Sequence, residues 1–196
     1  KPFQVFRVNG VAIGVIGLLS TETPTVVKAG NTGDYKFLDP AATVREFLPQ
    51  MRKQGARYIV ALTHQGLDAD RKLASDVPQI NLIVGGHSHD KTAKAELAGH
   101  RTYIVQADRY GRFAGVVEMT VDTRTHQVVG VESRLVEIND KAGLEADPTV
   151  VAIAEKYNAR VKPLMAQLVG KTATDLHKRY AEGQLDSTLG NAIADE

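Results

Sequence analysis

The chain begins with residues that alternate between apolar and polar, which is the period of a half-buried β-strand. The alternation covers Phe3 to Arg7, and a second strand-like run extends from Val11 to Leu19. Between them, Asn9-Gly10 supplies the positive φ angles of a tight turn, so the sequence predicts a β-hairpin. A polar, glycine-bearing loop is expected to continue to about Phe37.

The middle of the chain switches between helical and buried-strand patterns. A helix is predicted from Asp39-Pro40, a side-chain cap followed by a first-turn proline, to about Gln54. The continuous apolar runs Tyr58–Leu62 and Asn81–Val84 predict buried strands, and a helix over Leu67–Asp76 joins them. Strand, helix and strand in this order form a right-handed crossover with parallel strands. The sequence therefore predicts an α/β fold.

The remainder of the chain favours β structure followed by helix. Strand-like runs cover residues 102–106, 115–122 and 127–137, and we expect them to pair antiparallel. A helical pattern begins at Asp147-Pro148 and continues to Leu168. Residues 171–196 start like a strand and end like the beginning of a helix, and they are too few to bury a core of their own.

Composition narrows the classes of function. A formal net charge of +1 gives no broad field for nucleic acid or an anionic membrane. Because the chain has no cysteine, any metal must be held by histidine, carboxylate or amide groups. The longest apolar runs are far shorter than the roughly 20 residues that cross a bilayer, so no membrane span is expected.

Three histidines follow the two buried strands. His64 comes directly after the first strand, and His87 and His89 follow the second by way of Gly85-Gly86, a pair expected to allow a tight turn. Parallel strands end at one edge of a sheet, where open α/β sheets bind ligands, so the three side chains should converge. Neutral imidazole is a good ligand for zinc, manganese and related ions. The sequence therefore predicts that these histidines bind metal.

The segments that carry the histidines, Ala61–Asp70 and Ile83–His89, resemble a family of bacterial 5'-nucleotidases, UDP-sugar hydrolases and 2',3'-cyclic phosphodiesterases. Segments Asn9–Leu18 and Gln106–Arg112 extend the resemblance in both directions. At the far end, Leu185–Asp195 is similar to the opening of the family's C-terminal nucleotide-binding domain, with Asp186 where glutamate is usual. The resemblance thus covers essentially the whole chain.

The resemblance implies the second half of a calcineurin-like metallophosphoesterase domain, an αββα sandwich that holds two divalent metal ions such as zinc or manganese. It implies that His64 and His87 bind one metal and His89 the other. Residues 1–146 would be the phosphoesterase half, 147–170 a linker helix, and 171–196 the truncated start of the nucleotide-binding domain. The parent would be a periplasmic or extracellular hydrolase of nucleotides or other phosphoesters.

The resemblance also places the family's other metal ligands, and the histidine that assists the leaving group, upstream of Lys1. We therefore expect only a partial metal site here, no catalytic residue, and hydrolysis at or near background by this chain alone. A sheet cut from a sandwich would expose more apolar surface than monomers tolerate, so self-association is expected.

Two other functions remain open. Sulfate-thiol hydrolases of thiosulfate oxidation share the implied fold, and Asp90 resembles the aspartate that ends their histidine motif. The nucleotidase is favoured by three other segments: Thr21–Pro24, Leu38–Pro40 and Leu189-Gly190-Asn191. Alternatively, the chain is a non-catalytic metal-binding or scaffold module.

Several polar residues near the histidines have a simpler interpretation. For Asp68, Asp70, Arg71 and Lys72 we expect helix capping and surface pairing rather than catalysis. Arg109 and Tyr110 leave a strand at an edge loop and are candidates for substrate contact, although a purely structural role is favoured. The remaining histidines are expected to be solvated loop residues: His100, His126 and His177.

Overall fold

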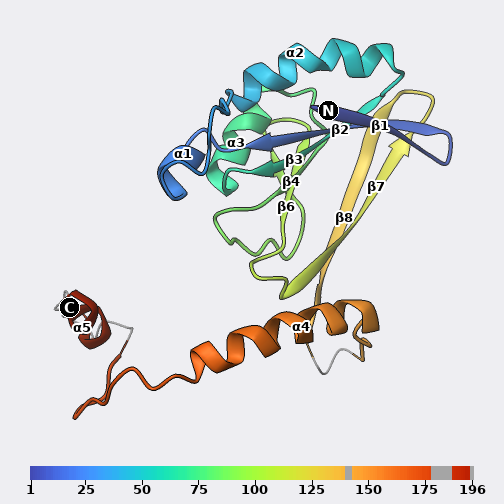
Figure 1. Cartoon of the computed structure of the whole chain (residues 1–196). Helices are drawn as coiled ribbons and strands as arrows, with labels where there is room; N and C mark the ends of the chain where they lie inside the picture. Colours follow the sequence, from blue (N-terminus) through green and yellow to red (C-terminus); the bar gives the residue numbers. More distant parts are fainter. Residues whose placement is uncertain (140–142, 178–186, 195–196) are drawn as a thin grey trace. The chain divides into compact units, whose positions relative to one another are not determined.

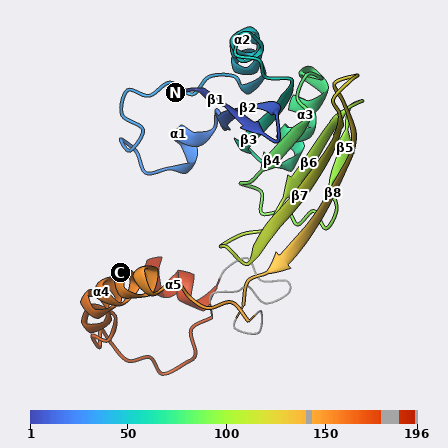
Figure 2. The ribbon, with the colours of Figure 1, turned by 90° about the vertical axis from the view of Figure 1, so that its right-hand side faces the viewer.

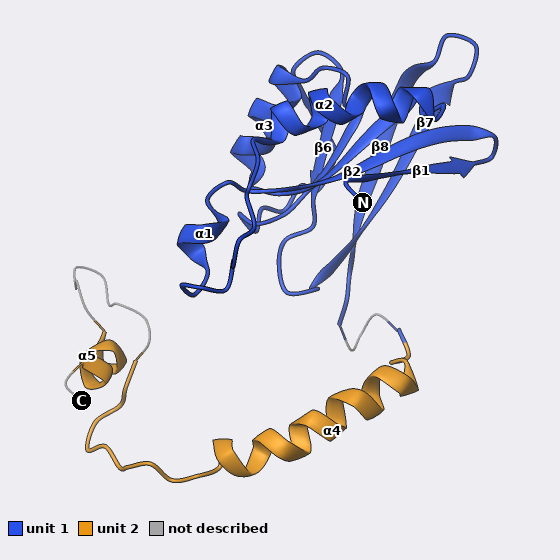
Figure 3. Cartoon of the chain, turned by 45° about the horizontal axis from the view of Figure 1, so that its top comes forward, with its two compact units in different colours: residues 1–144 blue, residues 145–196 orange. Residues whose placement is uncertain are grey.

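The computed structural model describes residues 1–139, 143–177 and 187–194. The chain forms two compact units, Lys1–Leu144 and Glu145–Glu196 (Figure 3). The assignment of these residues to a phosphoesterase half, a linker helix and a nucleotide-binding domain stays a prediction.

The first unit is built on a six-stranded sheet in the order β1-β2-β3-β4-β6-β5 (Figure 1). The strands β2, β3, β4 and β6 are mutually parallel, and β1 and β5 pair antiparallel at the two edges. The strands are β1 (Phe3–Val8), β2 (Val11–Leu19), β3 (Tyr58–His64), β4 (Leu82–Gly85), β5 (Glu96–Ala98) and β6 (Thr102–Gln106). The α/β fold and the parallel crossover expected from the sequence are therefore confirmed.

Strand β6 corrects one expectation. We expected residues 102–106 to pair antiparallel. Strand β6 does so with β5, but it runs parallel to β4 on its other side, with Ile83 opposite Ile104. The connection between β4 and β6 is long enough to return the chain to the starting end of the sheet, which a parallel pairing requires. It also forms the short strand β5, which the sequence analysis missed.

The hairpin at the start of the chain agrees with the sequence. Asn9 and Gly10 both have positive φ angles, 48° and 78°, between the paired strands β1 and β2. The loop that follows differs, because it contains the four-residue helix α1 (Thr23–Val26), where an irregular loop was expected. Pro24 in its first turn and the bond from the Thr25 hydroxyl to the Glu22 carbonyl (2.7 Å) favour this local turn.

Two helices cover one face of the sheet, α2 (Pro40–Lys53) and α3 (Leu67–Asp76), as Figure 2 shows. Helix α2 begins at Asp39, whose carboxylate accepts a bond from the Ala42 N–H (2.7 Å), and Gly55 follows its end with a φ of 91°. Apolar side chains from the two helices and from the sheet form the buried core: Val44, Met51, Leu73, Ala74, Ile16, Ile59, Ala61, Ile83 and Ile104.

The antiparallel hairpin of β7 (Phe113–Asp122) and β8 (Gln127–Glu137) forms a separate two-stranded sheet. It packs on the face of the main sheet away from the helices, where the buried Tyr58 hydroxyl donates to the Asp122 carbonyl (3.4 Å). A small cavity of about 120 Å³ lies between the two sheets, lined in part by Val84, Val105 and Val117. This hairpin confirms the antiparallel pairing expected for residues 115–122 and 127–137.

The second unit contains α4 (Pro148–Met165) and α5 (Thr188–Ala194). Asp147 caps α4 by accepting bonds from the N–H groups of Thr149 and Val150, in agreement with the sequence. Residues 171–177 form no strand, contrary to the expectation, and Asp186 lies outside the described residues. None of the helices in the described part of the chain combines the length and apolar character needed to cross a membrane.

Candidate metal centre

His64 and His87 lie side by side at the carboxyl edge of the parallel strands. His64 is the last residue of β3, and His87 follows β4 after Gly86. Their ring centroids are 5.2 Å apart, with an angle of 71° between the ring planes. Strand β2 stays paired with β3 to this edge, because the N–H of Ser20, which directly follows β2, donates to the His64 carbonyl (3.2 Å). The structure therefore brings together two of the three predicted ligands.

The glycines before His87 leave room for neighbouring side chains. Neither Gly85 nor Gly86 has a positive φ; the histidines themselves do, at 88° for His87 and 61° for His89. Instead, the glycines provide space. A Cβ on Gly86 would lie 3.0 Å from Nδ1 of His64, and a Cβ on Gly85 would lie 2.3 Å from Oδ2 of Asp70. Side chains at these positions would displace the groups beneath the histidine loop.

Asp70 contradicts the expectation of a surface role. Its side chain is fully buried, with Oδ1 accepting a bond from Nε2 of Gln65 (2.9 Å) and Oδ2 making no well-formed hydrogen bond to the described residues. Desolvation by burial raises the pKa of the Asp70 carboxyl, and the nearby Thr63 and Gln65 side chains oppose this. The signal for burial was present, because Asp70 is three residues from both Leu67 and Leu73 on the core face of α3.

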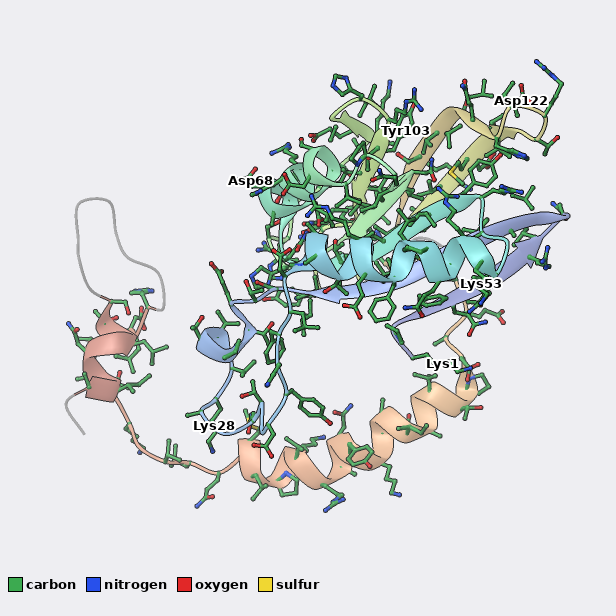
Figure 4. The ribbon with its side chains drawn as sticks, turned by 90° about the horizontal axis from the view of Figure 1, so that it is seen from above. Lys1, Lys28, Lys53, Asp68, Tyr103 and Asp122 are labelled. Carbon is green, nitrogen blue, oxygen red and sulfur yellow. The ribbon has the colours of Figure 1, made fainter. Side chains whose placement is uncertain are left out.

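The other charged residues of α3 form surface pairs, as expected. Arg71 contacts Asp68 (2.7 Å) and Glu96 (2.7 Å), and Lys72 contacts Asp76 (2.5 Å). Asp68 lies on the outer surface of the helix (Figure 4). Capping by Asp68 is wrong, however, because Gly66 occupies the N-cap position and no side chain caps the helix there.

His89 faces a different neighbour. Its ring lies 5.4 Å from that of Tyr110, at an interplanar angle of 59°. Tyr110 is 84% exposed and has a positive φ of 55°, while the adjacent Arg109 approaches the carboxylate of Asp108 at 3.8 Å. Tyr110 thus borders the histidine loop. Contact of Arg109 or Tyr110 with substrate stays a prediction.

The donor chemistry fits part of a metal site. Two imidazoles from adjacent strands suit zinc and related borderline ions, which are most often four-coordinate in proteins. Within residues 1–139, 143–177 and 187–194, no cluster of three or more histidine and carboxylate side chains is positioned to hold a metal ion. The assignment of His64, His87 and His89 as ligands therefore remains a prediction.

The other histidines are solvent-exposed, as expected for loop residues. His126 lies in the turn between β7 and β8 with a φ of 58°, and His100 follows β5. His177 belongs to the second unit and is separated from Asp175 by one residue along the chain. Its backbone N–H donates to the Thr188 hydroxyl (2.7 Å).

Comparison with curated proteins finds relatives along essentially the whole chain. The chain is 29% identical over 203 residues to an endonuclease from Bacillus subtilis, covering 98% of the chain and 16% of the relative. It is also 29% identical over 213 residues to a 5'-nucleotidase from Diplobatis ommata, covering 100% of the chain and 36% of the relative. A cell wall protein of Listeria monocytogenes is 26% identical over 99% of the chain and 28% of its own length. The chain spans well under half the length of these relatives.

Solved structures show the same fold. A 5'-nucleotidase precursor from Thermus thermophilus matches with a TM-score of 0.73 and 27% identity, over 99% of this chain and 41% of that one. A sulfate thiohydrolase from the same species also has a TM-score of 0.73, at 23% identity over 87% of this chain and 30% of that one. A calcineurin-like phosphoesterase from Bacillus subtilis has a TM-score of 0.68 at 20% identity, over 84% of this chain and 59% of that one. No protein-family model matches the chain.

Proposed function

We propose that this chain, which belongs to the family of 5'-nucleotidases and calcineurin-like phosphoesterases, supplies part of the metal centre of a phosphoester hydrolase. The single observation that carries the proposal is the pairing of His64 and His87, whose rings lie 5.2 Å apart at the carboxyl edge of the sheet. His89 would contribute from the same loop.

In this proposal the histidines hold metal and do not transfer protons. Two divalent ions, zinc, manganese or similar, would supply stabilisation of the phosphoryl oxygens and activation of water for in-line attack. The parallel strands β3 and β4 contribute the fixed positions from which His64 and His87 project, which a loop alone would not provide. The chain itself contributes no acid or base in this scheme.

Nucleotides are the proposed substrates, because 5'-nucleotidases are among the relatives and the structural neighbours. We further propose that the whole protein acts in the periplasm or outside the cell, as the similarity to a cell wall protein supports. The remaining metal ligands would lie outside the chain, so residues 1–196 alone would hydrolyse phosphoesters at or near background.

A sulfate-thiol hydrolase is the second candidate, and Asp90 was the residue that favoured it. In the structure Asp90 is used within the loop, where its carboxylate accepts from the Ser88 hydroxyl (2.5 Å) and its N–H donates to Gln106 (2.5 Å). The 5'-nucleotidase precursor from Thermus thermophilus matches more of the chain at higher identity than the thiohydrolase does. This longer match at higher identity favours the nucleotidase.

The proposal is tested by phosphate release from AMP in the presence of Mn²⁺ or Zn²⁺. The whole protein encoded by the gene should release phosphate, and both His64→Ala and His87→Ala should abolish most of the activity. His100→Ala, which alters an exposed histidine away from the pair, should leave activity unchanged. A whole protein inactive on AMP with every metal, or His64→Ala and His87→Ala variants as active as wild type, would contradict the proposal.

A further inference from the structure

The loop that carries His87 and His89 has an unfavourable backbone conformation. Both histidines have positive φ angles, 88° and 61°, in a region that residues with a Cβ rarely adopt. Such conformations persist only where surrounding contacts hold them, and they cluster at functional sites.

Gln106 joins the two ends of the loop. Its Nε2 donates to the Gly86 carbonyl before His87 (3.2 Å), and its Oε1 accepts from the Asp90 N–H after His89 (2.5 Å). A carbonyl can only accept and a backbone N–H can only donate, so these partners fix the orientation of the amide. Gln106 is only 2% exposed, so water cannot readily replace either bond.

Gln106 is itself held firmly. It ends strand β6, where it pairs with Gly85 of β4. Its backbone N–H donates to the Thr92 hydroxyl (2.7 Å), and its carbonyl accepts from the Thr92 N–H (3.0 Å). The amide therefore projects from a rigid strand, which makes it a fixed reference point for the loop.

Ser88 connects the same loop to helix α3. Its hydroxyl accepts from the Leu67 N–H (3.0 Å) and has one proton to donate, either to the Asp90 carboxylate (2.5 Å) or to Oε1 of Gln106 (3.2 Å). The shorter contact to a charged acceptor takes the proton. The Gly86 carbonyl accepts from both Gly66 N–H (2.9 Å) and Gln106, so the loop is bonded on each side.

We propose that Gln106 is a positioning residue that holds the His87–His89 loop in its strained conformation, so that the imidazoles are presented to metal. This rests on the proposed function, in which these histidines are metal ligands. Hydrogen bonds beneath metal ligands typically change metal affinity by about 10- to 100-fold when they are removed. Gln106 acts through the loop backbone and touches no reacting atom.

The test compares Gln106→Leu with Thr102→Val in the 196-residue chain. Thr102 is a matched control, because it is buried in the same strand and donates to the Ile80 carbonyl (2.8 Å) away from the loop. Co²⁺ affinity is measured by calorimetry, exchange of the backbone amides of residues 87–90 by NMR, and stability by thermal unfolding.

Gln106→Leu should weaken Co²⁺ binding by about 10-fold or more and speed exchange of the Asp90 amide. Thr102→Val should lower the unfolding temperature without either effect. Gln106→Glu keeps the acceptor for Asp90 but loses the donor to Gly86, so it should protect the Asp90 amide yet still weaken Co²⁺ binding. It also serves as the second variant if Gln106→Leu does not fold.

Unchanged Co²⁺ affinity and unchanged Asp90 amide exchange in Gln106→Leu would overturn the proposal, as would unchanged Co²⁺ affinity in Gln106→Glu or an equal loss of affinity in Thr102→Val. If the wild-type chain binds no Co²⁺, the metal function is tested instead by phosphate release from the whole protein and its His64→Ala and His87→Ala variants. Amide exchange of residues 87–90 then decides the positioning role by itself, so the two failures can be told apart.

Discussion

At the scale of single residues, the buried carboxylate of Asp70 should make the stability of the protein depend on pH. Burial raises its pKa above that of an unfolded chain, which is about 4. Between that value and the folded pKa, the native state holds a proton that the unfolded state has lost, so stability falls as pH rises. Asp70→Asn removes the charge while keeping an oxygen to accept from Gln65.

Asp70→Asn should therefore be more stable than wild type at pH 7, by about 1 to 3 kcal/mol, the cost of an unpaired buried polar group. The difference should shrink towards pH 4. Urea unfolding at several pH values measures it. Asp68→Asn, in an exposed position on the same helix, should change stability by less than about 0.5 kcal/mol at either pH. A pH-independent difference for Asp70→Asn would refute the argument.

The sequence located the histidines but not the residues beneath them. His64 and His87 were predictable because strand ends and glycines mark them in the local sequence. Asp70 and Gln106 are chemically ordinary in sequence. The importance of Asp70 comes from its burial, and that of Gln106 from burial and from partners about 15 to 20 residues away in the chain. The helical period places Asp70 on the same face as Leu67 and Leu73. The position of Gln106 beside the loop depends on the parallel pairing of β6 with β4, which has no local signal.

At the scale of secondary-structure elements, the cap of helix α2 supports the packing of the sheet. Asp39 accepts from the Ala42 N–H (2.7 Å), and α2 buries Val44 and Met51 in the core. Asp39→Ala leaves that N–H without its partner and should lower the free energy of unfolding by about 1 kcal/mol. Chemical denaturation measures the change. Asp39→Ser retains a capping oxygen and should cost clearly less; equal losses would rule out capping as the cause.

Local signals predicted most elements, and tertiary pairing decided the rest. The Asn9-Gly10 turn, the Asp39 cap and the apolar run Tyr58–Leu62 each carry their own evidence, so these elements matched the structure. The direction of β6 has no local signal, because a five-residue strand with a short apolar centre fits either direction. Strand β5, with three residues, is too short to show a period at all.

At the scale of the whole molecule, the main sheet has one face only partly covered. Helices α2 and α3 bury the face that includes Ala61, while Leu62 and Val84, paired in register, point to the other face. The β7–β8 hairpin packs on that second face, yet Leu62 remains 47% exposed and Val84 36% exposed. Exposed apolar rows of this kind favour association with another surface.

We therefore propose that the isolated chain self-associates through this face. Sedimentation at micromolar concentration should show species larger than the 21.2 kDa monomer. Leu62→Ser should shift the distribution towards monomer. Burial of the leucine side chain in the interface favours association, whereas burial of a serine hydroxyl without a hydrogen-bond partner opposes it. Val129→Ser, which alters a residue that is 68% exposed on β8, should leave association unchanged. A wild-type chain that stays monomeric would show that the hairpin already covers enough of the sheet.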